Sequence, residues 1–269
     1  MQNIHVITDC CDENARLRQV ARYGAYFPRS NIFFAGASSD IEAAFLLVDT
    51  LDALDGSPGV IMVNVAPRHG VAKKHANGTP FGMIQVGEAT VFASVDGNTL
   101  RLIKQLKPDL SLCIYDIPEV VPHLTEDVEL QQKIISTQFR SFEFLPRVAK
   151  AVMMDGRSLP GNQVSLADHC GENSLDVVAF VDCFGNLKTT ILPEDLNFEC
   201  GNLVKLEVGA TVEDVMCYSR LKDIPNDELG LTIGSSGLGK HRFMELMVQG
   251  KSAAAKFGAK VGTSVRLIK

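Results

Sequence analysis

Apolar and polar positions along the first half of the chain follow two patterns, one typical of strands and one typical of helices. Short apolar runs predict strands, and the longer segments between them carry apolar residues at helical spacing. The predicted elements are a strand at 4–8, a helix at 15–27, a strand at 31–37, a helix at 40–54 and a strand at 60–66. Because strands that alternate with helices form right-handed βαβ units, we expect an α/β domain on a largely parallel sheet.

The carboxyl ends of these strands form the candidate ligand edge, since open parallel sheets bind ligands there. The residues that follow the three strands are 9–12, 36–40 and 66–70. Further apolar runs at 81–87, 90–96 and 110–117 extend the predicted sheet. A helix is expected from about Glu129 to Met153.

The pattern changes at 155–163, where glycine, proline and polar residues indicate a linker. We therefore predict two domains, residues 1–157 and 158–269. The segment 175–192 predicts a hairpin that turns at residues 184–186. Later strands are expected at 204–208, 214–219, 229–234, 243–248 and 264–268. One short helix is expected at 252–258. Short strands between turn signals predict a smaller, mostly antiparallel, barrel-like domain.

Composition narrows the class of protein. Of the 269 residues 46% are hydrophobic, which is enough for a sizeable core. The formal net charge of -6 and the absence of a basic run argue against a nucleic-acid partner. No run approaches the length of a membrane span, and the seven cysteines form no metal-ligand spacing. We expect a cytoplasmic protein with reduced thiols, no membrane partner and no metal.

One stretch resembles a phosphate-binding P-loop. In residues 231–246, Gly234 is followed after four residues by Gly239 and Lys240, but His241 stands where a magnesium-binding hydroxyl is required. The motif also needs a helix after it, whereas the following run reads as a strand. We therefore expect a hairpin and keep an ATP-binding site only as a remote alternative.

Motifs along nearly the whole chain resemble those of the S-adenosylmethionine (SAM) hydroxide adenosyltransferases, whose relatives are the fluorinases and chlorinases. The most specific motif is VDCFGNLKTTI, and the serine-glycine tail with its following segment is the second. The stretches that carry the resemblance are 8–14, 63–74, 95–100, 180–191, 232–237 and 243–262.

The resemblance implies a trimer that binds SAM between the N-terminal domain of one subunit and the C-terminal domain of its neighbour, with nucleophilic displacement of methionine at the ribose C5′. It places Asp9 at the ribose hydroxyls, Asn186 at adenine and Asp182 near the methionine ammonium group. It also places further residues at the ligand: Asp96, Phe139, Phe184, Tyr218, Ser235 or Ser236. From the residues alone, Asp9 could instead cap the following helix, and the turn at 184–186 occurs in many β proteins.

Three positions differ from the hydrolases of this family. Ala66 stands at the place of their aspartate, Lys73 at that of their arginine, and Arg140 at that of their histidine. A methyl group and a guanidinium cannot act as a general base.

Three hypotheses follow. In the first, an anion is the nucleophile, with Ser141, Arg140, His69 and Lys73 on its side of the site, because anion attack needs positioning more than a base. In the second, His69 replaces the missing base and hydrolysis persists. In the third, the protein is a non-catalytic, adenosyl-binding trimer with a regulatory role.

Overall fold

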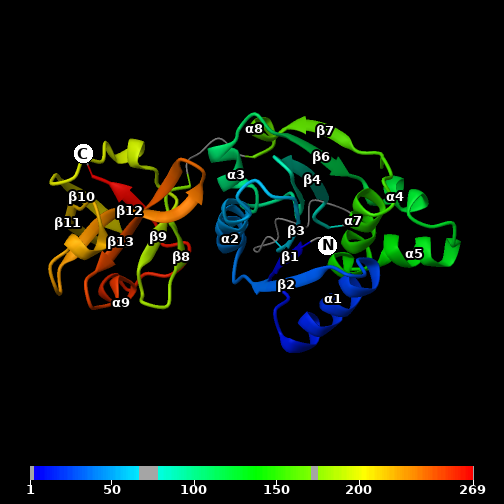
Figure 1. Ribbon diagram of the computed structural model, residues 1–269, viewed down its shortest axis with the longest axis horizontal. Coiled ribbons are helices and arrows are strands. Elements are labelled where there is room, and N and C mark those ends of the chain that lie inside the picture. Colours follow the sequence, from blue (N-terminus) through cyan, green and yellow to red (C-terminus); the bar gives the residue numbers. More distant parts are fainter. Residues whose placement is uncertain (1–2, 67–77, 171–174, 269) are drawn as a thin grey trace. The chain divides into compact units, whose positions relative to one another are not determined.

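The computed structural model describes residues 3–66, 78–170 and 175–268 and divides the chain into two units, 1–171 and 172–269 (Figure 1). The sequence placed this boundary at 157/158. Residues 162–165 form the last strand of the first sheet, paired with Ser111–Ile114, so they belong to the first unit.

The first unit contains one seven-stranded sheet in the order β2-β1-β3-β5-β4-β6-β7. β2, β1, β3 and β5 pair in parallel, and β4, β6 and β7 extend the sheet with antiparallel pairings. The strands are β1 (Asn3–Thr8), β2 (Asn31–Gly36), β3 (Gly59–Asn64), β4 (Phe81–Val86), β5 (Ala89–Ser94), β6 (Ser111–Tyr115) and β7 (Asn162–Ser165). The expected parallel-rich α/β domain is confirmed.

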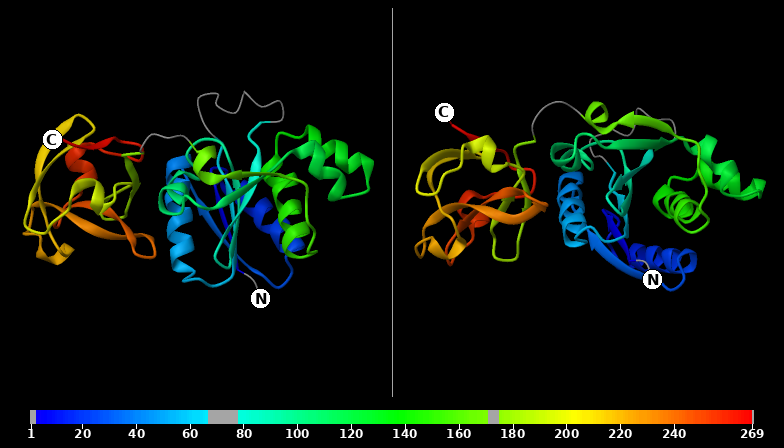
Figure 2. Two further views of the ribbon diagram at one scale, coloured as in Figure 1. Left: turned by 90° about the horizontal axis from the view of Figure 1, so that it is seen from above. Right: turned by 45° about the horizontal axis from the view of Figure 1, so that its top comes forward.

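Helices cover both faces of this sheet: α2 and α3 pack on one face, and α1 and α7 pack on the other (Figure 2). The core on the α1 and α7 face contains Tyr23, Phe27, Phe92 and Phe144. The helices are α1 (Glu13–Tyr26), α2 (Asp40–Ala53), α3 (Arg101–Leu106), α4 (Ile117–Val120), α5 (Val128–Ser136), α6 (Arg140–Glu143), α7 (Leu145–Met153) and α8 (Leu166–His169).

The second unit is a nearly closed sheet in the order β14-β10-β11-β12-β13-β9-β8. All its pairings are antiparallel except β11 with β12. Its elements are β8 (Val178–Val181), β9 (Leu187–Thr189), β10 (Leu203–Val208), β11 (Thr211–Cys217), β12 (Leu229–Leu238), β13 (His241–Val248), α9 (Ala253–Phe257) and β14 (Val265–Leu267).

A seam of backbone contacts joins the two edges of this second sheet. Val177 forms an antiparallel bridge with Ser264. The backbone N–H of Val178 donates to the carbonyl of Thr263 at 2.8 Å, and that of Val265 donates to the carbonyl of Asp176 at 2.9 Å. Because the seam pairs the chain next to β8 with the chain next to β14, the expected barrel-like domain is confirmed.

Candidate functional site

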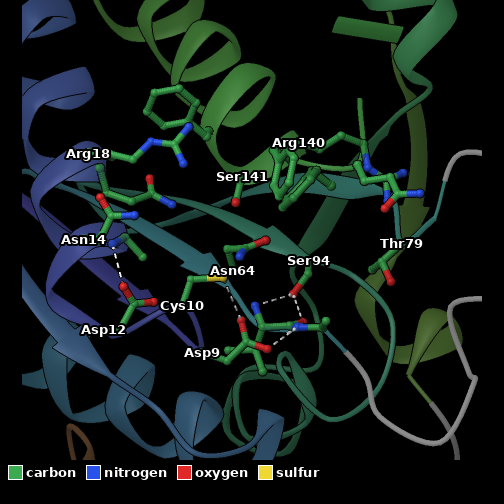
Figure 3. Close-up of a pocket in the computed structure, with 18 residues that line it drawn as sticks. Asp9, Cys10, Asp12, Asn14, Arg18, Asn64, Thr79, Ser94, Arg140 and Ser141 are labelled. Atoms are coloured by element: carbon green, nitrogen blue, oxygen red, sulfur yellow. Dashed lines mark hydrogen bonds between the residues drawn. The ribbon is translucent and has the colours of Figure 1, made fainter. Parts of the chain in front are cut away.

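A cavity of about 620 Å³ lies in the first unit beside the carboxyl ends of β1 and β3 (Figure 3). β1 and β3 are neighbouring parallel strands, so the residues that follow them reach the same edge of the sheet. α1 and the segment 138–142 supply further walls of the cavity. The structure therefore gathers four predicted site residues in one cavity: Asp9, Phe139, Arg140 and Ser141.

Asp9 is fixed at the strand edge by backbone contacts. Its N–H donates to the carbonyl of Asn64 at 3.2 Å, and its Oδ2 accepts from the N–H of Ala66 at 3.2 Å. The cap of α1 is Asp12, whose carboxylate accepts from the N–H of Ala15 at 3.0 Å. Asp9 is thus not the helix cap, and its carboxylate lines the cavity.

Cys10 follows Asp9 in the same wall, and its Sγ lies 3.7 Å from Asp9 Oδ1. Burial, together with the negative charge of Asp9, raises the pKa of the Cys10 thiol. The thiol is therefore protonated at neutral pH and is a poor nucleophile.

The prediction of a helix from 129 to 153 is wrong in one respect: the structure has three separate helices there, α5, α6 and α7. Thr137 adopts an extended conformation, and its hydroxyl accepts from the N–H of Phe139 at 3.0 Å. Pro146 in the first turn of α7 favours a new helix start there. The break places Arg140 and Ser141 on the four-residue α6, where both line the cavity.

α6 is anchored by a buried carboxylate at its last residue. Glu143 is paired with Arg147 at 2.7 Å, Arg22 at 3.4 Å and Lys133 at 3.3 Å. Burial alone would raise the pKa of Glu143, but the hydrogen bond and charge of Arg147, with the charges around it, hold that pKa below its ordinary value. Glu143 thus ties α6 to α1, α5 and α7.

Arg140 carries a partly desolvated positive charge at the cavity. A Cβ added at Gly78, where φ is +70°, would overlap the guanidinium, so the side chain packs directly on that backbone. The Nη1 atom is buried and has no hydrogen-bond partner among the described residues. Desolvation lowers the pKa of Arg140, but the group remains protonated at working pH.

Two more polar side chains of the cavity are buried with an unsatisfied atom. Thr79 is 8% exposed and Gln19 is 5% exposed, and neither Thr79 Oγ1 nor Gln19 Oε1 has a partner in the described part of the chain. Both line the cavity. Such atoms are costly unless a ligand or water satisfies them, so this cavity is the candidate ligand site of the first unit.

Several polar residues of the cavity were not predicted from the sequence. Asn14, Arg18 and Gln19 project from one side of α1, and Asn64 ends β3. The sequence did contain a signal for Gln19, which is a polar residue at a buried position of an amphipathic helix. Thr79 carried no comparable sequence signal.

Other predicted residues of the first unit lie elsewhere. Asp96 is buried in the turn after β5, before Gly97 with φ +75°, and is not among the residues that line the cavity. His69 and Lys73 lie outside the described residues.

In the second unit, the predicted turn between β8 and β9 is organised by Asp182. Its Oδ1 accepts from the backbone N–H of Phe184 and of Asn186, each at 2.9 Å. Its Oδ2 accepts from Asn186 Nδ2 at 2.9 Å. Gly185 has φ +82°, which suits glycine. Asn186 Oδ1 is not used in this network.

A second cavity, of about 460 Å³, borders this turn. It is lined by Phe184, by Asn186 and by residues 248–252, which begin at the last residue of β13. Phe184 is 75% exposed, which is unusual for a phenylalanine. The structure thus brings Phe184 and Asn186 together at a cavity, and the hydrogen bonds of Asp182 shape the turn that carries them.

The structure separates the two candidate serines. Ser236 is buried, and Lys188 Nζ lies 3.3 Å from both its Oγ and Glu245 Oε2. Ser235 is exposed on the irregular part of β12, where the register with β13 shifts. Tyr218 packs near Gly230 and lines neither cavity.

The P-loop-like stretch forms the β12–β13 hairpin, as the sequence analysis expected. Gly234 lies within β12, and β13 begins at His241, so a strand follows the motif where a phosphate site needs a helix. The geometry gives no support to ATP binding there.

The described residues contain no group of three or more histidine, cysteine or acidic side chains arranged to hold a metal ion. No helix in that part of the chain is long and apolar enough to cross a membrane.

The fold and the cavity define a two-domain protein with a polar ligand site at the carboxyl edge of a parallel-rich sheet. Residues 176–266 match the family model described as the SAM hydroxide adenosyltransferase C-terminal domain. This match supports the resemblance to the SAM hydroxide adenosyltransferase family that was identified from the sequence. The matched domain supports SAM or a related adenosyl compound as the ligand class.

Two solved structures share the fold. An uncharacterized conserved protein from Thermotoga maritima is 19% identical with a TM-score of 0.69, and the match covers 98% of this chain and 100% of that one. A conserved hypothetical protein from Thermus thermophilus is 18% identical with a TM-score of 0.62, and the match covers 100% of both chains. The comparison with curated proteins gives no match.

Proposed function

We propose that this protein binds SAM, or a related adenosyl compound, and displaces methionine at the ribose C5′ with water or an anion. The observation that carries the proposal is Asp9, a carboxylate fixed at the carboxyl edge of β1 and lining the first-unit cavity. An ionised carboxylate only accepts hydrogen bonds, which suits the vicinal diol of a ribose.

For the second unit, we propose that Asn186 recognises adenine. Its Nδ2 is engaged by Asp182, so Oδ1 is the atom offered to the exocyclic amine of the base. Phe184 supplies an exposed aromatic face, Ser235 an exposed hydroxyl and Asp182 the carboxylate near the methionine ammonium group. Tyr218, Ser236, Phe139 and Asp96 complete the proposed ligand set.

The nucleophile-side residues in this proposal are Arg140, Ser141, His69 and Lys73. The absence of the hydrolase acid at Ala66 and of its histidine at Arg140 favours an anion over water, because an anion needs no general base. Hydrolysis assisted by His69 is the second form of the same proposal.

A non-catalytic, regulatory adenosyl-binding protein is the alternative function. It is favoured by the loss of the acid, arginine and histidine positions, and it predicts SAM binding without turnover. In both cases we propose a cytoplasmic homotrimer. The seven cysteines are all free, as in a reducing compartment.

The test is to incubate the purified protein with SAM, with and without chloride, and to identify products by mass spectrometry beside a boiled control. Adenosine with methionine indicates hydrolysis, and a chloride-dependent 5′-chloro product indicates halide attack. SAM that binds but stays intact supports the regulatory alternative. SAM that does not bind overturns the proposal.

Asp9→Asn tests the observation that carries the proposal. We expect the Kd for SAM to rise about tenfold or more, because a charge-assisted hydrogen bond is lost. Asp109→Asn, an exposed aspartate outside the cavity, is the matched control. Light scattering tests the trimer, which is wrong if the mass stays near the 29.2 kDa of one chain.

A further inference from the structure

Arg140 and Thr79 form a local pair at the cavity. The Arg140 guanidinium packs on the backbone of Gly78, and Thr79 is the next residue along the chain. Figure 3 shows both side chains at the same side of the cavity, away from Asp9 and Asp12. Arg140 Nη1 and Thr79 Oγ1 are both buried, and each has no hydrogen-bond partner among the described residues.

No carboxylate of the described residues forms an ion pair with Arg140. Glu143, the acidic residue of the same helix, forms its ion pairs with Arg147, Arg22 and Lys133. Arg140 is half-buried, and its buried Nη1 has neither a counter-ion nor a hydrogen-bond partner among the described residues, which is unfavourable. An anion bound beside it would recover part of that cost.

The donors fit one shape of anion better than another. A guanidinium presents N–H groups in a planar fork, which matches the paired oxygens of a carboxylate or a phosphate. The Thr79 hydroxyl supplies a further donor from a different direction. A halide offers a single spherical acceptor and would use only part of this set.

We infer that Arg140 and Thr79 form a subsite for a polyatomic oxyanion, a carboxylate or a phosphate, within the first-unit cavity. Its catalytic consequence rests on the proposed function: the oxyanion is the nucleophile. An oxygen of the anion forms a bond to C5′ while the C5′–S bond breaks. The electron pair goes to sulfur, and the sulfonium leaves as the neutral thioether of methionine. No proton moves, which agrees with alanine at position 66.

The first experiment measures binding without SAM. ¹³C-labelled acetate, inorganic phosphate and chloride are each titrated onto the purified protein, with NMR line broadening for the two oxyanions and a thermal shift for all three. We expect an oxyanion to bind more tightly than chloride. Arg140→Gln should weaken that binding about tenfold or more, because a charged donor is lost.

Two variants make the result specific. Thr79→Val keeps the side-chain shape and removes the hydroxyl, and it should weaken oxyanion binding without loss of fold. Arg16→Gln removes an exposed arginine of α1 that does not line the cavity, so it should leave binding unchanged. Equal binding of acetate, phosphate and chloride, or oxyanion binding that survives in Arg140→Gln, overturns the subsite.

The second experiment adds SAM and identifies products. Acetate should give 5′-O-acetyladenosine and phosphate should give adenosine 5′-monophosphate, and the arm that reacts identifies the anion class. If SAM is converted only with chloride or water, the oxyanion inference fails while the proposed function stands. If oxyanions bind through Arg140 but SAM does not bind, the subsite stands and the proposed function fails.

Discussion

Arg147 donates a hydrogen bond at 2.7 Å to Oε2 of Glu143, the last residue of the short helix that presents Arg140 and Ser141 to the cavity. The side chains of Glu143 and Arg147 are 7% and 14% exposed, so the pair is well shielded from water. We predict that Glu143→Gln lowers the free energy of unfolding by about 3 kcal/mol, because it leaves three cations without their shared anion. Denaturant unfolding measures the change.

The control for this variant is Glu88→Gln, since Glu88 is exposed in the turn between β4 and β5. It should change the unfolding free energy by less than about 0.5 kcal/mol. Comparable losses in the two variants would contradict the anchoring role of Glu143.

The same carboxylate predicts acid sensitivity. The pKa of Glu143 in the folded protein lies below its ordinary value of 4.5. Its contribution is therefore fully present above about pH 4.5, and it is lost as the pH falls through the lower folded pKa. Between neutral pH and that range, the stability difference between the wild type and Glu143→Gln should stay constant, and it should shrink below it. Urea titrations at several pH values test this, and a difference that grows on acidification would be inconsistent with a depressed pKa.

Gly78 and Gly87 offer a matched pair of substitutions. Both have positive φ, +70° and +57°, but a Cβ at Gly78 would meet the Arg140 guanidinium, while nothing lies within 4 Å of a Cβ at Gly87. Gly87→Ala should cost about 1 kcal/mol of backbone strain alone. Gly78→Ala should cost more and should displace Arg140, so that oxyanion binding weakens. Thermal unfolding and the acetate titration together check this, and equal behaviour of the two variants would refute it.

Replacing Gln19 by an apolar residue should raise the stability of the protein and weaken its binding of SAM. Its Oε1 is buried without a partner among the described residues. Gln19→Met keeps the approximate shape and removes this polar atom, so we expect the unliganded protein to become more stable by about 1 kcal/mol while affinity for SAM falls. Gln131→Met is the comparison, because Gln131 Nε2 donates to the carbonyl of Thr125 at 2.8 Å and the variant should lose stability. Calorimetric unfolding with and without SAM distinguishes the expected gain in stability of Gln19→Met from the expected loss in Gln131→Met.

Asp182→Ala should unfold the β8–β9 turn locally. The carboxylate accepts three hydrogen bonds within residues 182–186, so their loss should cost about 2 kcal/mol. Hydrogen exchange of the amides of Phe184 and Asn186 should accelerate, and β10 should be unaffected. Unchanged exchange at these two amides would show that Asp182 does not organise the turn.

Local patterns were sufficient to predict most elements of the fold. The strands β1 to β6 and the hairpin of β8 and β9 follow from apolar runs and turn residues. The strand β7 was not predicted, because three of its four residues are polar and all four are exposed or half-buried. It is defined by long-range pairing with β6. No local periodicity reports such a pairing.

The candidate site was predicted in part for a similar reason. Asp9 follows a strand, a position that a sequence pattern can reveal. Thr79 and Gln19 matter because their buried atoms meet no partner, which depends on what the rest of the fold brings near them. The break before Arg140 was also missed, because the side chain of Thr137 ends the helix by a local hydrogen bond that competes with helical periodicity.

The seam between Val177 and Ser264 has a consequence for how this protein could be recombined. It holds the point where the chain enters the second unit beside the point where the chain leaves it. A module whose entry and exit are neighbours can be joined to another sequence at one place, or given new ends elsewhere, without opening its core. The family match at 176–266 spans the same stretch that the seam closes, so the matched segment coincides with a module of this kind.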